Sequence, residues 1–279
     1  MDFQPVIKWN GSKRLQSEEI ISYFPKYIRT YYEPFCGGCS VLYQLMVSDE
    51  KFARDFVCSD TNSDLIDLWL TIKDNPDGLF QEYSKMWNDL KKIEDRQLKR
   101  KYFEEIRAEF NRTRNPYLFF FLMRTCTNGM PRYNKKKEFN ATFHLTRDGI
   151  KPKRLQPVLM NWSYLLNENE VTFRCCDYSI IFDEAEEDDL LYLDPPYSIT
   201  RKDKYFGKVE INDFFNKLIY LDNSGLKYIF SFEGSKSTPI KVPIECYDNM
   251  VYINSVPGSF RRTLEGQTRE DVFESLYWN

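Results

Sequence analysis

The residues with the most suggestive chemistry in this chain are Asp194, Pro195, Pro196 and Tyr197, which directly follow a short apolar run. The run, residues 190–193, has the length and composition of a buried β-strand. A carboxylate after a strand can accept a hydrogen bond from an amino group, and each proline stiffens the turn because its ring fixes φ. The tyrosine offers a flat face to a planar ring. These residue types suit a reaction at the exocyclic amine of a heterocycle, although an ordinary turn with a surface tyrosine would carry the same residues.

A glycine-containing turn earlier in the chain has the composition of a nucleotide-binding loop, and it consists of Phe35, Cys36, Gly37 and Gly38. Because glycine has no Cβ, the backbone of this turn can approach a ligand closely. Asp60 ends the next predicted strand, about 20 residues after the glycines, where nucleotide-binding sheets place an acidic ligand for ribose hydroxyls. The alternative role for Asp60 is the N-cap of the following helix.

The elements that must position these residues alternate between strands and helices. Helices are predicted at residues 17–24, 40–46 and 63–73. Strands are predicted at residues 29–33, 56–59, 171–174, 190–193, 228–232, 251–254 and 273–277. This order is typical of a doubly wound α/β sheet that binds a nucleotide: a strand, the glycine turn, a helix, a second strand and an acidic residue.

One long segment, residues 79–160, interrupts the sheet pattern with charged helices, an aromatic stretch and a loop-like region. We therefore expect an α/β fold in which a Rossmann-like sheet, formed by residues 1–78 and 161–279, carries a mostly helical insert. The chain has no internal repeat that would indicate a tandem architecture.

Three segments resemble one enzyme family. Asp-Pro-Pro-Tyr at residues 194–197 resembles the catalytic signature of amino-methyltransferases that use S-adenosylmethionine, especially DNA adenine-N6 enzymes. Residues 8–13, Lys-Trp-Asn-Gly-Ser-Lys, resemble the N-terminal cofactor motif of that family, and residues 33–38 resemble its glycine-rich turn. The order of motifs is similar to that of the alpha group, the Dam-like D12 class. The resemblance runs from about residue 5 to the C-terminus, with Cys39 at a position where the family often has glycine or another small residue.

The resemblance implies a site-specific methyltransferase that transfers a methyl group from S-adenosylmethionine to N6 of an adenine flipped out of duplex DNA. It implies that Asp194 and the carbonyl of Pro195 accept the two N–H bonds of the amine, and that Tyr197 stacks on the base. It also implies that no metal and no serine, cysteine or histidine nucleophile takes part.

The cofactor side of the site follows from the same resemblance. It places Trp9 against the cofactor, an ammonium at Lys13 against the cofactor carboxylate, and Asp177 near the cofactor adenine. The glycine turn of residues 35–38, Asp60 and Asp194 complete the expected cofactor-binding set.

The insert is expected to recognise the DNA sequence. Its residues 128–134 resemble the Dam-type motif Asn-Gly-x-x-Arg-Tyr-Asn, and the predicted DNA-binding residues are Arg124, Asn128, Met130, Arg132, Asn134 and Lys136. Arginine recognises guanine, and asparagine recognises adenine, through paired hydrogen bonds in the major groove. We expect Arg132 to contact guanine, Met130 to act as an apolar wedge, and Lys136 to contact phosphate. Residues 141–144, Ala-Thr-Phe-His, depart from the Val-Pro-Phe/Tyr-Gly of many relatives, so GATC is only a guess at the recognition sequence.

Composition narrows the class of protein. The net charge of the 279 residues is −3 and the pI is about 5.5, so a basic DNA-binding face must be local, and basic residues indeed concentrate in the insert. No run of 18 apolar residues indicates a membrane span. The N-terminus lacks a signal-peptide pattern, and seven irregularly spaced cysteines favour reduced thiols. We expect a cytoplasmic protein of a bacterium or phage-infected cell, for which a monomer suffices and beside which a restriction endonuclease can act separately.

Other functions stay open. The same tetrad could serve cytosine N4, RNA adenine or glutamine nitrogen as the methyl acceptor, and the fold could belong to a catalytically silent DNA-binding regulator. A nicotinamide-linked oxidoreductase would require a Gly-x-Gly-x-x-Gly fingerprint, which residues 35–40 do not supply.

Overall fold

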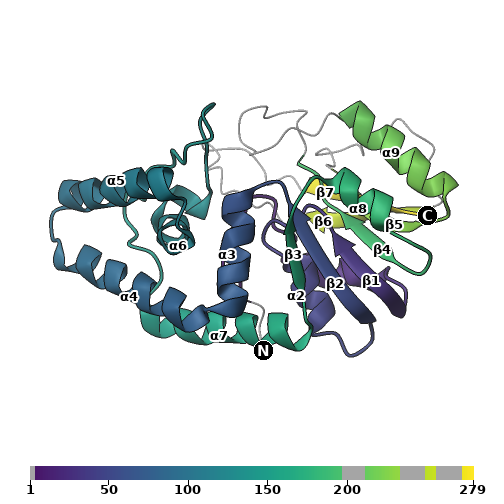
Figure 1. The fold of residues 1–279 in the computed structure, drawn as a ribbon, viewed down its shortest axis with the longest axis horizontal. Coiled ribbons are helices and arrows are strands. Elements are labelled where there is room, and N and C mark those ends of the chain that lie inside the picture. The colour runs from purple at the N-terminus through teal and green to yellow at the C-terminus, as the bar shows by residue number, and fades with distance from the viewer. Residues whose placement is uncertain (1–3, 197–210, 233–248, 256–271) are drawn as a thin grey trace, which may run out of the picture.

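The computed structural model describes residues 4–196, 211–232, 249–255 and 272–279, which form a seven-stranded sheet and the helices packed around it (Figure 1). In chain order, the strands are β1 (Tyr27–Glu33), β2 (Phe52–Asp60), β3 (Thr172–Cys175), β4 (Leu190–Leu193), β5 (Lys227–Phe232), β6 (Asn249–Ser255) and β7 (Val272–Trp278). Within the sheet, their order is β3-β2-β1-β4-β5-β7-β6. β1 to β5 are parallel, whereas β7 is antiparallel to both β5 and β6.

Helices cover both faces of the sheet. Because side chains alternate between the two faces along each strand, neighbouring strand residues belong to different buried clusters. Tyr31 and Tyr192 belong to one buried cluster, together with residues of α1 (Ser17–Ser22), α2 (Ser40–Met46), α3 (Ser63–Asp74) and α7 (Pro152–Glu168). Tyr32 and Leu191 belong to a second cluster, with α8 (Tyr178–Glu184) and α9 (Ile211–Asn223). All four residues of β4 are buried, as expected of a parallel strand covered on both faces. The predicted doubly wound α/β fold is confirmed.

The insert is mostly helical in the structure. It contains α4 (Pro76–Lys92), α5 (Arg96–Thr113), α6 (Pro116–Thr125) and the 3₁₀ turn η1 (Thr127–Gly129). Each of the three α-helices is preceded by an N-cap residue whose side chain accepts a backbone N–H from the first turn. These N-caps are Asn75, Asp95 and Asn115. After η1, the chain forms loops up to α7, linked by two isolated bridges, Cys126 with Phe143 and Tyr133 with Phe139.

The aromatic stretch predicted in the insert forms its core. Phe119, Phe120 and Phe121 are fully buried, and they belong to the same hydrophobic cluster as the sheet residues Tyr31 and Tyr192. The expected boundary at residue 160 falls within α7, which packs against both α3 and α4. The helices of the insert therefore continue the core of the sheet, and the division into two domains stays a prediction. No helix among the described residues is long and apolar enough to cross a bilayer.

Candidate active site

A pocket opens at the edge where the parallel strands end. It is lined by residues 9–13, 35–41, 60–61, 177–178 and 194–196, so it collects the N-terminal loop, the glycine turn and the ends of β2 and β4. Ligands of open α/β sheets bind at this edge, where the strand order changes direction. Here β1 lies between β2 and β4, and the pocket lies at the carboxyl ends of these three strands. The structure thereby brings together the predicted cofactor residues and the start of the tetrad.

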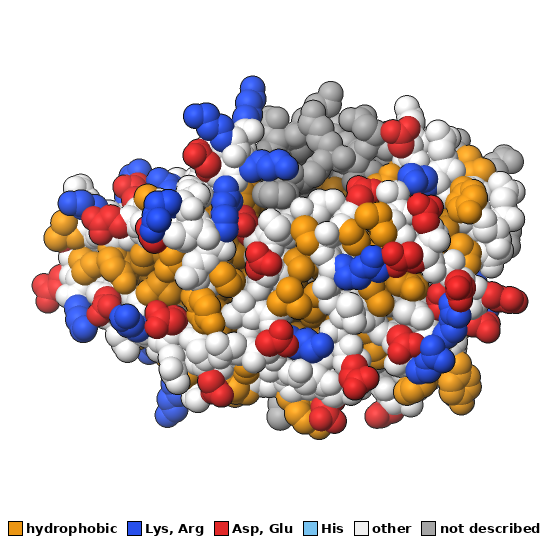
Figure 2. Space-filling model, in the orientation of Figure 1, with side chains coloured by type: hydrophobic (Ala, Val, Ile, Leu, Met, Phe, Trp, Pro, Cys, Tyr) orange, Lys and Arg blue, Asp and Glu red, His pale blue; other side chains and the backbone are white. Residues whose placement is uncertain are grey.

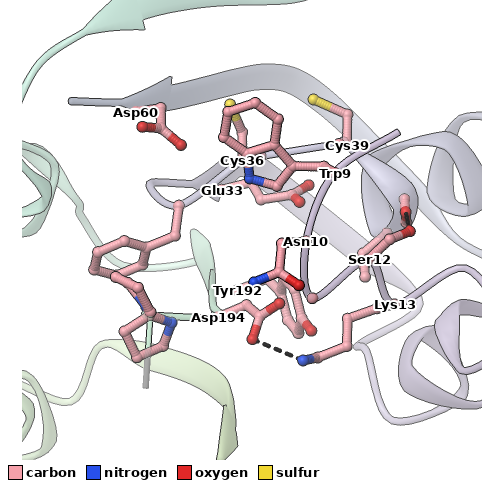
Figure 3. A pocket seen from close by; sticks show the side chains of 18 of the residues that line it. Trp9, Asn10, Ser12, Lys13, Glu33, Cys36, Cys39, Asp60, Tyr192 and Asp194 are labelled. Carbon is pink, nitrogen blue, oxygen red and sulfur yellow. Dashed lines mark hydrogen bonds and ion pairs between the residues drawn. The ribbon is translucent and has the colours of Figure 1, made fainter. Parts of the chain in front are cut away.

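Asp194 and Lys13 form an ion pair in this pocket (Figure 3). The Lys13 Nζ lies 2.9 Å from Asp194 Oδ1 and 3.1 Å from Glu274 Oε2, and only 5% of the lysine side chain is exposed. Burial favours the neutral amine, but the two carboxylates outweigh burial and raise the pKa of Lys13 above its ordinary value. The ammonium thus faces protein carboxylates in this structure, and its predicted contact with a cofactor carboxylate stays a prediction.

Glu33, for which the sequence alone predicts no separate role, lies in the same pocket. Its Oε2 accepts hydrogen bonds from the Tyr31 hydroxyl at 2.9 Å and from the Leu42 N–H at 3.1 Å. Burial raises the pKa of Glu33 to about 8, against the lowering effect of the Tyr31 hydrogen bond, and the nearby Asp194 raises it further. The signal for Glu33 was present in the sequence: like Asp60, it is the last residue of a predicted strand at the ligand-binding edge.

Asp60 is fixed by backbone amides. Its Oδ1 accepts the Asn62 N–H at 2.9 Å, and the N–H groups of Gly37 and Thr61 also donate to the carboxylate. Burial nevertheless raises the pKa of Asp60 to about 6. Asn62, not Asp60, caps α3, because the Asn62 side chain accepts the Leu65 N–H. The alternative structural role for Asp60 is therefore filled by its neighbour.

The glycine turn packs against Trp9. A Cβ on Gly37 would lie 2.7 Å from Trp9 Cδ1, and a Cβ on Gly38 would lie 3.1 Å from Trp9 Cβ. Gly37 also has a φ of 45°, and its carbonyl accepts the Trp69 indole N–H at 2.9 Å. The structure shows that these glycines make room for the indole that lines the pocket, and the predicted close approach of a ligand to the turn stays a prediction.

The remaining predicted cofactor residues also line the pocket. Phe35 packs on Tyr178, with ring centroids 5.2 Å apart, and Cys36 is buried. Asp177 is the exposed N-cap of α8, where its Oδ1 accepts the Ser179 N–H at 3.0 Å. Pro195 and Pro196 line the pocket beside Asp194. Tyr197 lies outside the described residues. Within the described part of the chain, no group of three or more His, Cys, Asp or Glu residues could hold a metal ion.

The predicted DNA-contacting residues lie on the insert, on α6 and the loops after it. Arg124 is near the end of α6, and burial lowers its pKa. Asn128, Arg132 and Lys136 are exposed, whereas Met130 is half-buried. In the space-filling view, basic side chains stand along the upper rim of the insert (Figure 2). The structure thus places this set on one part of the insert, apart from the pocket lining.

Asn134 organises the loop that carries these residues. Its Oδ1 accepts the N–H groups of Lys136 and Glu138, and its Nδ2 donates to Glu138 Oε2 at 2.7 Å. Both ends of the amide are therefore used inside the turn in this structure. The predicted adenine contact of Asn134 stays a prediction that would require the amide to exchange these partners.

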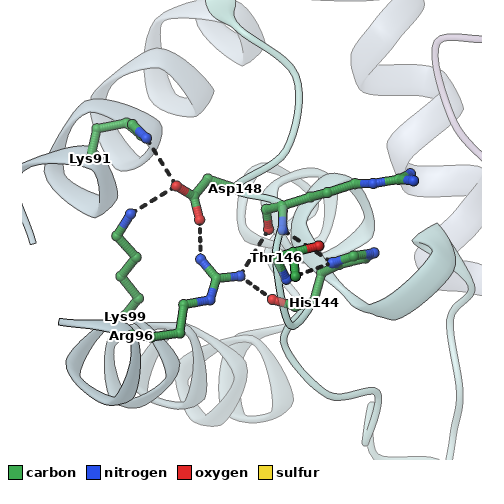
Figure 4. Close-up of polar contacts among 7 residues, drawn as sticks. Lys91, Arg96, Lys99, His144, Thr146 and Asp148 are labelled. Atoms are coloured by element: carbon green, nitrogen blue, oxygen red, sulfur yellow. Dashed lines mark hydrogen bonds and ion pairs between the residues drawn. The ribbon is translucent and has the colours of Figure 1, made fainter. Parts of the chain in front are cut away.

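A second part of the insert surface is fixed by Asp148, which pairs with three cations from α4 and α5: Lys91, Arg96 and Lys99 (Figure 4). Lys99 Nζ lies 2.8 Å from Asp148 Oδ2. The Arg96 guanidinium also donates to the carbonyl oxygens of His144 and Arg147. This network holds the loop before α7, and Arg147 of that loop lies close enough to Lys8 to lower the pKa of Lys8, after the larger effects of burial and Arg124.

Comparisons with known proteins agree with this geometry. The family model of the D12 class N6 adenine-specific DNA methyltransferases matches residues 9–236. The type II methyltransferase M.MjaIII of Methanocaldococcus jannaschii is 31% identical over 255 residues, which cover 83% of this chain and 84% of the relative. A DNA adenine methylase of Haemophilus influenzae is 29% identical over 215 residues, which cover 76% of this chain and 70% of the relative. The DNA adenine methylase of Escherichia coli K12 is 28% identical and covers 75% of this chain and 70% of its own.

Proposed function

Because this chain belongs to the D12 class of N6 adenine-specific DNA methyltransferases, we propose that its pocket binds S-adenosylmethionine and that Asp194 receives the target amine there. The chain methylates adenine in DNA, as its family does. The proposal concerns the cofactor, the residues that bind it and the residues that act on the base.

The residues around the pocket fit S-adenosylmethionine in charge and shape. The cofactor carries a sulfonium, an ammonium and two ribose hydroxyls, and it supplies an electrophilic methyl group on the sulfonium. The pocket offers four acidic side chains: Glu33, Asp60, Asp177 and Asp194. Asp60, which three backbone amides hold in place, is suited to the ribose hydroxyls, and Glu33 to a positively charged group. Trp9 and Phe35 provide aromatic surface in the pocket lining.

The role of Asp194 follows from its place and its partner. The N6 lone pair of adenine is delocalised into the ring, so the amine is a poor nucleophile. An ionised Asp194 and the carbonyl of Pro195 would accept the two N–H bonds of the amine and favour a pyramidal nitrogen. These contacts strengthen as positive charge develops on nitrogen, which is the condition for catalysis. Lys13 fixes the orientation of Asp194, because its ammonium lies 2.9 Å from Asp194 Oδ1.

A base in a duplex cannot reach this pocket, so the adenine must be flipped out, at a cost of a few kcal/mol. We propose that the insert provides the DNA contacts that offset this cost. Arg132, exposed on the loop that Asn134 organises, is our candidate for guanine recognition, and Lys136 for phosphate.

The ion pair between Lys13 and Asp194, beside the glycine turn and Asp60, is the observation that carries this proposal. The test is to incubate the purified protein with unmethylated genomic DNA and S-adenosylmethionine, digest the DNA to nucleosides, and identify the product by mass spectrometry. N6-methyldeoxyadenosine is the expected product. N4-methyldeoxycytidine would leave the cofactor assignment intact and refute the acceptor, and no modified nucleoside would refute the proposed reaction.

A further inference from the structure

Glu274 is 80 positions away from Asp194 in the sequence (274 − 194), yet both carboxylates contact the same ammonium. The Lys13 Nζ lies 2.9 Å from Asp194 and 3.1 Å from Glu274. The Glu274 side chain is 23% exposed and that of Asp194 is 19% exposed, so both are largely shielded from water. The three side chains form one charged group in which a lysine bridges two carboxylates.

The direction of β7 explains this contact. β7 is antiparallel to β5, and Ser275 pairs with Phe232, the last residue of β5. The first residues of β7 therefore lie at the edge where β4 and β5 end. Glu274 shares a face with Leu276, two residues further on, and Leu276 packs in the buried cluster that includes α1 and α2. Lys13 lies in the N-terminal loop, four positions before the first residue of α1, so the fold places Glu274 on the face that this loop covers.

The second carboxylate changes what Asp194 experiences. If the buried ammonium were paired with Asp194 alone, its positive charge would offset the negative charge of that carboxylate. Asp194 would then be a weaker hydrogen-bond acceptor for the amine. With Glu274 at 3.1 Å, the ammonium contacts a second carboxylate as well as Asp194, and the charges of these three side chains sum to one negative charge. That remaining charge is of the sign that stabilises positive charge developing on the target nitrogen.

We propose that Glu274 is a positioning residue of the methyl-transfer reaction, which holds the Lys13 ammonium between two carboxylates and so keeps Asp194 effective as an acceptor. This inference rests on the proposed role of Asp194. Glu274 acts through Lys13 and does not touch the base or the methyl donor.

The test compares Glu274→Gln with the wild type. Glutamine keeps the shape of the side chain and removes its charge, so the fold and the pocket are preserved. We expect kcat to fall by about tenfold, by analogy with the loss measured when the hydrogen-bonding partner that orients a metal ligand is removed, while the KM values for S-adenosylmethionine and DNA change by less than about twofold. A merely structural role would instead raise the KM for the cofactor, because Lys13 lines its pocket. Glu184→Gln is the matched control, since Glu184 pairs with Arg174 on the surface and should leave both constants unchanged.

A double-mutant cycle with Lys13→Met tests whether Glu274 acts through Lys13. Glu274→Gln should cost about tenfold in the wild-type background and nothing further in the Lys13→Met background. A kcat within twofold of wild type for Glu274→Gln, or an equal loss in both backgrounds, would overturn the inference. The comparison of kcat and KM for Glu274→Gln decides the matter by itself if Lys13→Met fails to fold. Absence of N6-methyldeoxyadenosine with the wild-type protein would instead refute the proposed function.

Discussion

Glu33 offers a quantitative test of the cofactor pocket, because its pKa of about 8 lies within the range where the enzyme can be assayed. If the ionised carboxylate binds a positive group of the cofactor, then binding must first take the proton from Glu33. A carboxyl with this pKa is ionised in about one molecule in ten at pH 7 and in about nine in ten at pH 9. Since observed affinity scales with the fraction of competent protein, the part of the affinity that depends on Glu33 should rise about tenfold between these pH values.

The assay is the dissociation constant of S-adenosylmethionine, measured by calorimetry for the wild type and for Glu33→Gln at several pH values. The cofactor itself titrates, so the informative quantity is the ratio of the two constants, in which the ligand's own titration cancels. We expect the ratio of the Glu33→Gln constant to the wild-type constant to increase through about pH 8. A ratio that stays constant from pH 7 to pH 9 would refute the assignment of Glu33 to the cofactor.

Raising the pH should strengthen cofactor binding through Glu33, but it should reduce the stability of the folded protein. The unfolded chain loses the Glu33 proton near its ordinary pKa, whereas the folded protein keeps the proton up to about pH 8. Between these values the folded state binds more protons, so raising the pH across this window reduces the free energy of unfolding. Glu33→Gln should remove this dependence, and urea denaturation at pH 5 and pH 8 without cofactor measures it.

Three further predictions concern other parts of the molecule. Gly37→Ala combines a positive φ with a collision against the Trp9 indole, so it should weaken cofactor binding and reduce stability by about 1–3 kcal/mol. Gly225→Ala, which has a positive φ but no atom within 4 Å of its Cβ, should cost less, and thermal melting and cofactor titration compare the two variants. Asp148→Asn leaves three cations of the insert without their common carboxylate and should lower the melting temperature and the affinity for DNA. Asp49→Asn, at an exposed position, is the control, and equal melting temperatures for the two variants would contradict the prediction. Arg132→Ala should relax the choice of methylation site by about 1–3 kcal/mol, and sequencing of the methylated positions would show an unchanged pattern if Arg132 does not contact a base.

Much of the sheet could be predicted from the sequence because its signals are local. Residues 190–193 form a continuous apolar run and are β4, and residues 40–46, which follow the glycine turn, are α2. The acidic residues at the ends of predicted strands meet in one pocket because parallel strands end at the same edge. In the aromatic stretch at 117–121, Phe119, Phe120 and Phe121 are buried in the core of the insert.

Other features depend on contacts that the sequence does not display. Glu274 reaches Lys13 only because β7 runs antiparallel between β5 and β6. The glycines of the turn make room for Trp9, a residue almost thirty positions earlier, so their role could not be separated from ligand binding by composition alone (37 − 9 = 28). The amide of Asn134 is used within its own loop, a choice that depends on the position of Glu138 after folding.

The Asp194→Ala variant tests whether Asp194 acts on the target amine. It should bind S-adenosylmethionine and DNA with affinities close to those of the wild type, because Asp60, Glu33 and the insert are unchanged, and it should lose single-turnover methyl transfer to adenine. We expect methyl transfer to be lost while binding is retained. Near-normal formation of N6-methyldeoxyadenosine by Asp194→Ala would contradict it.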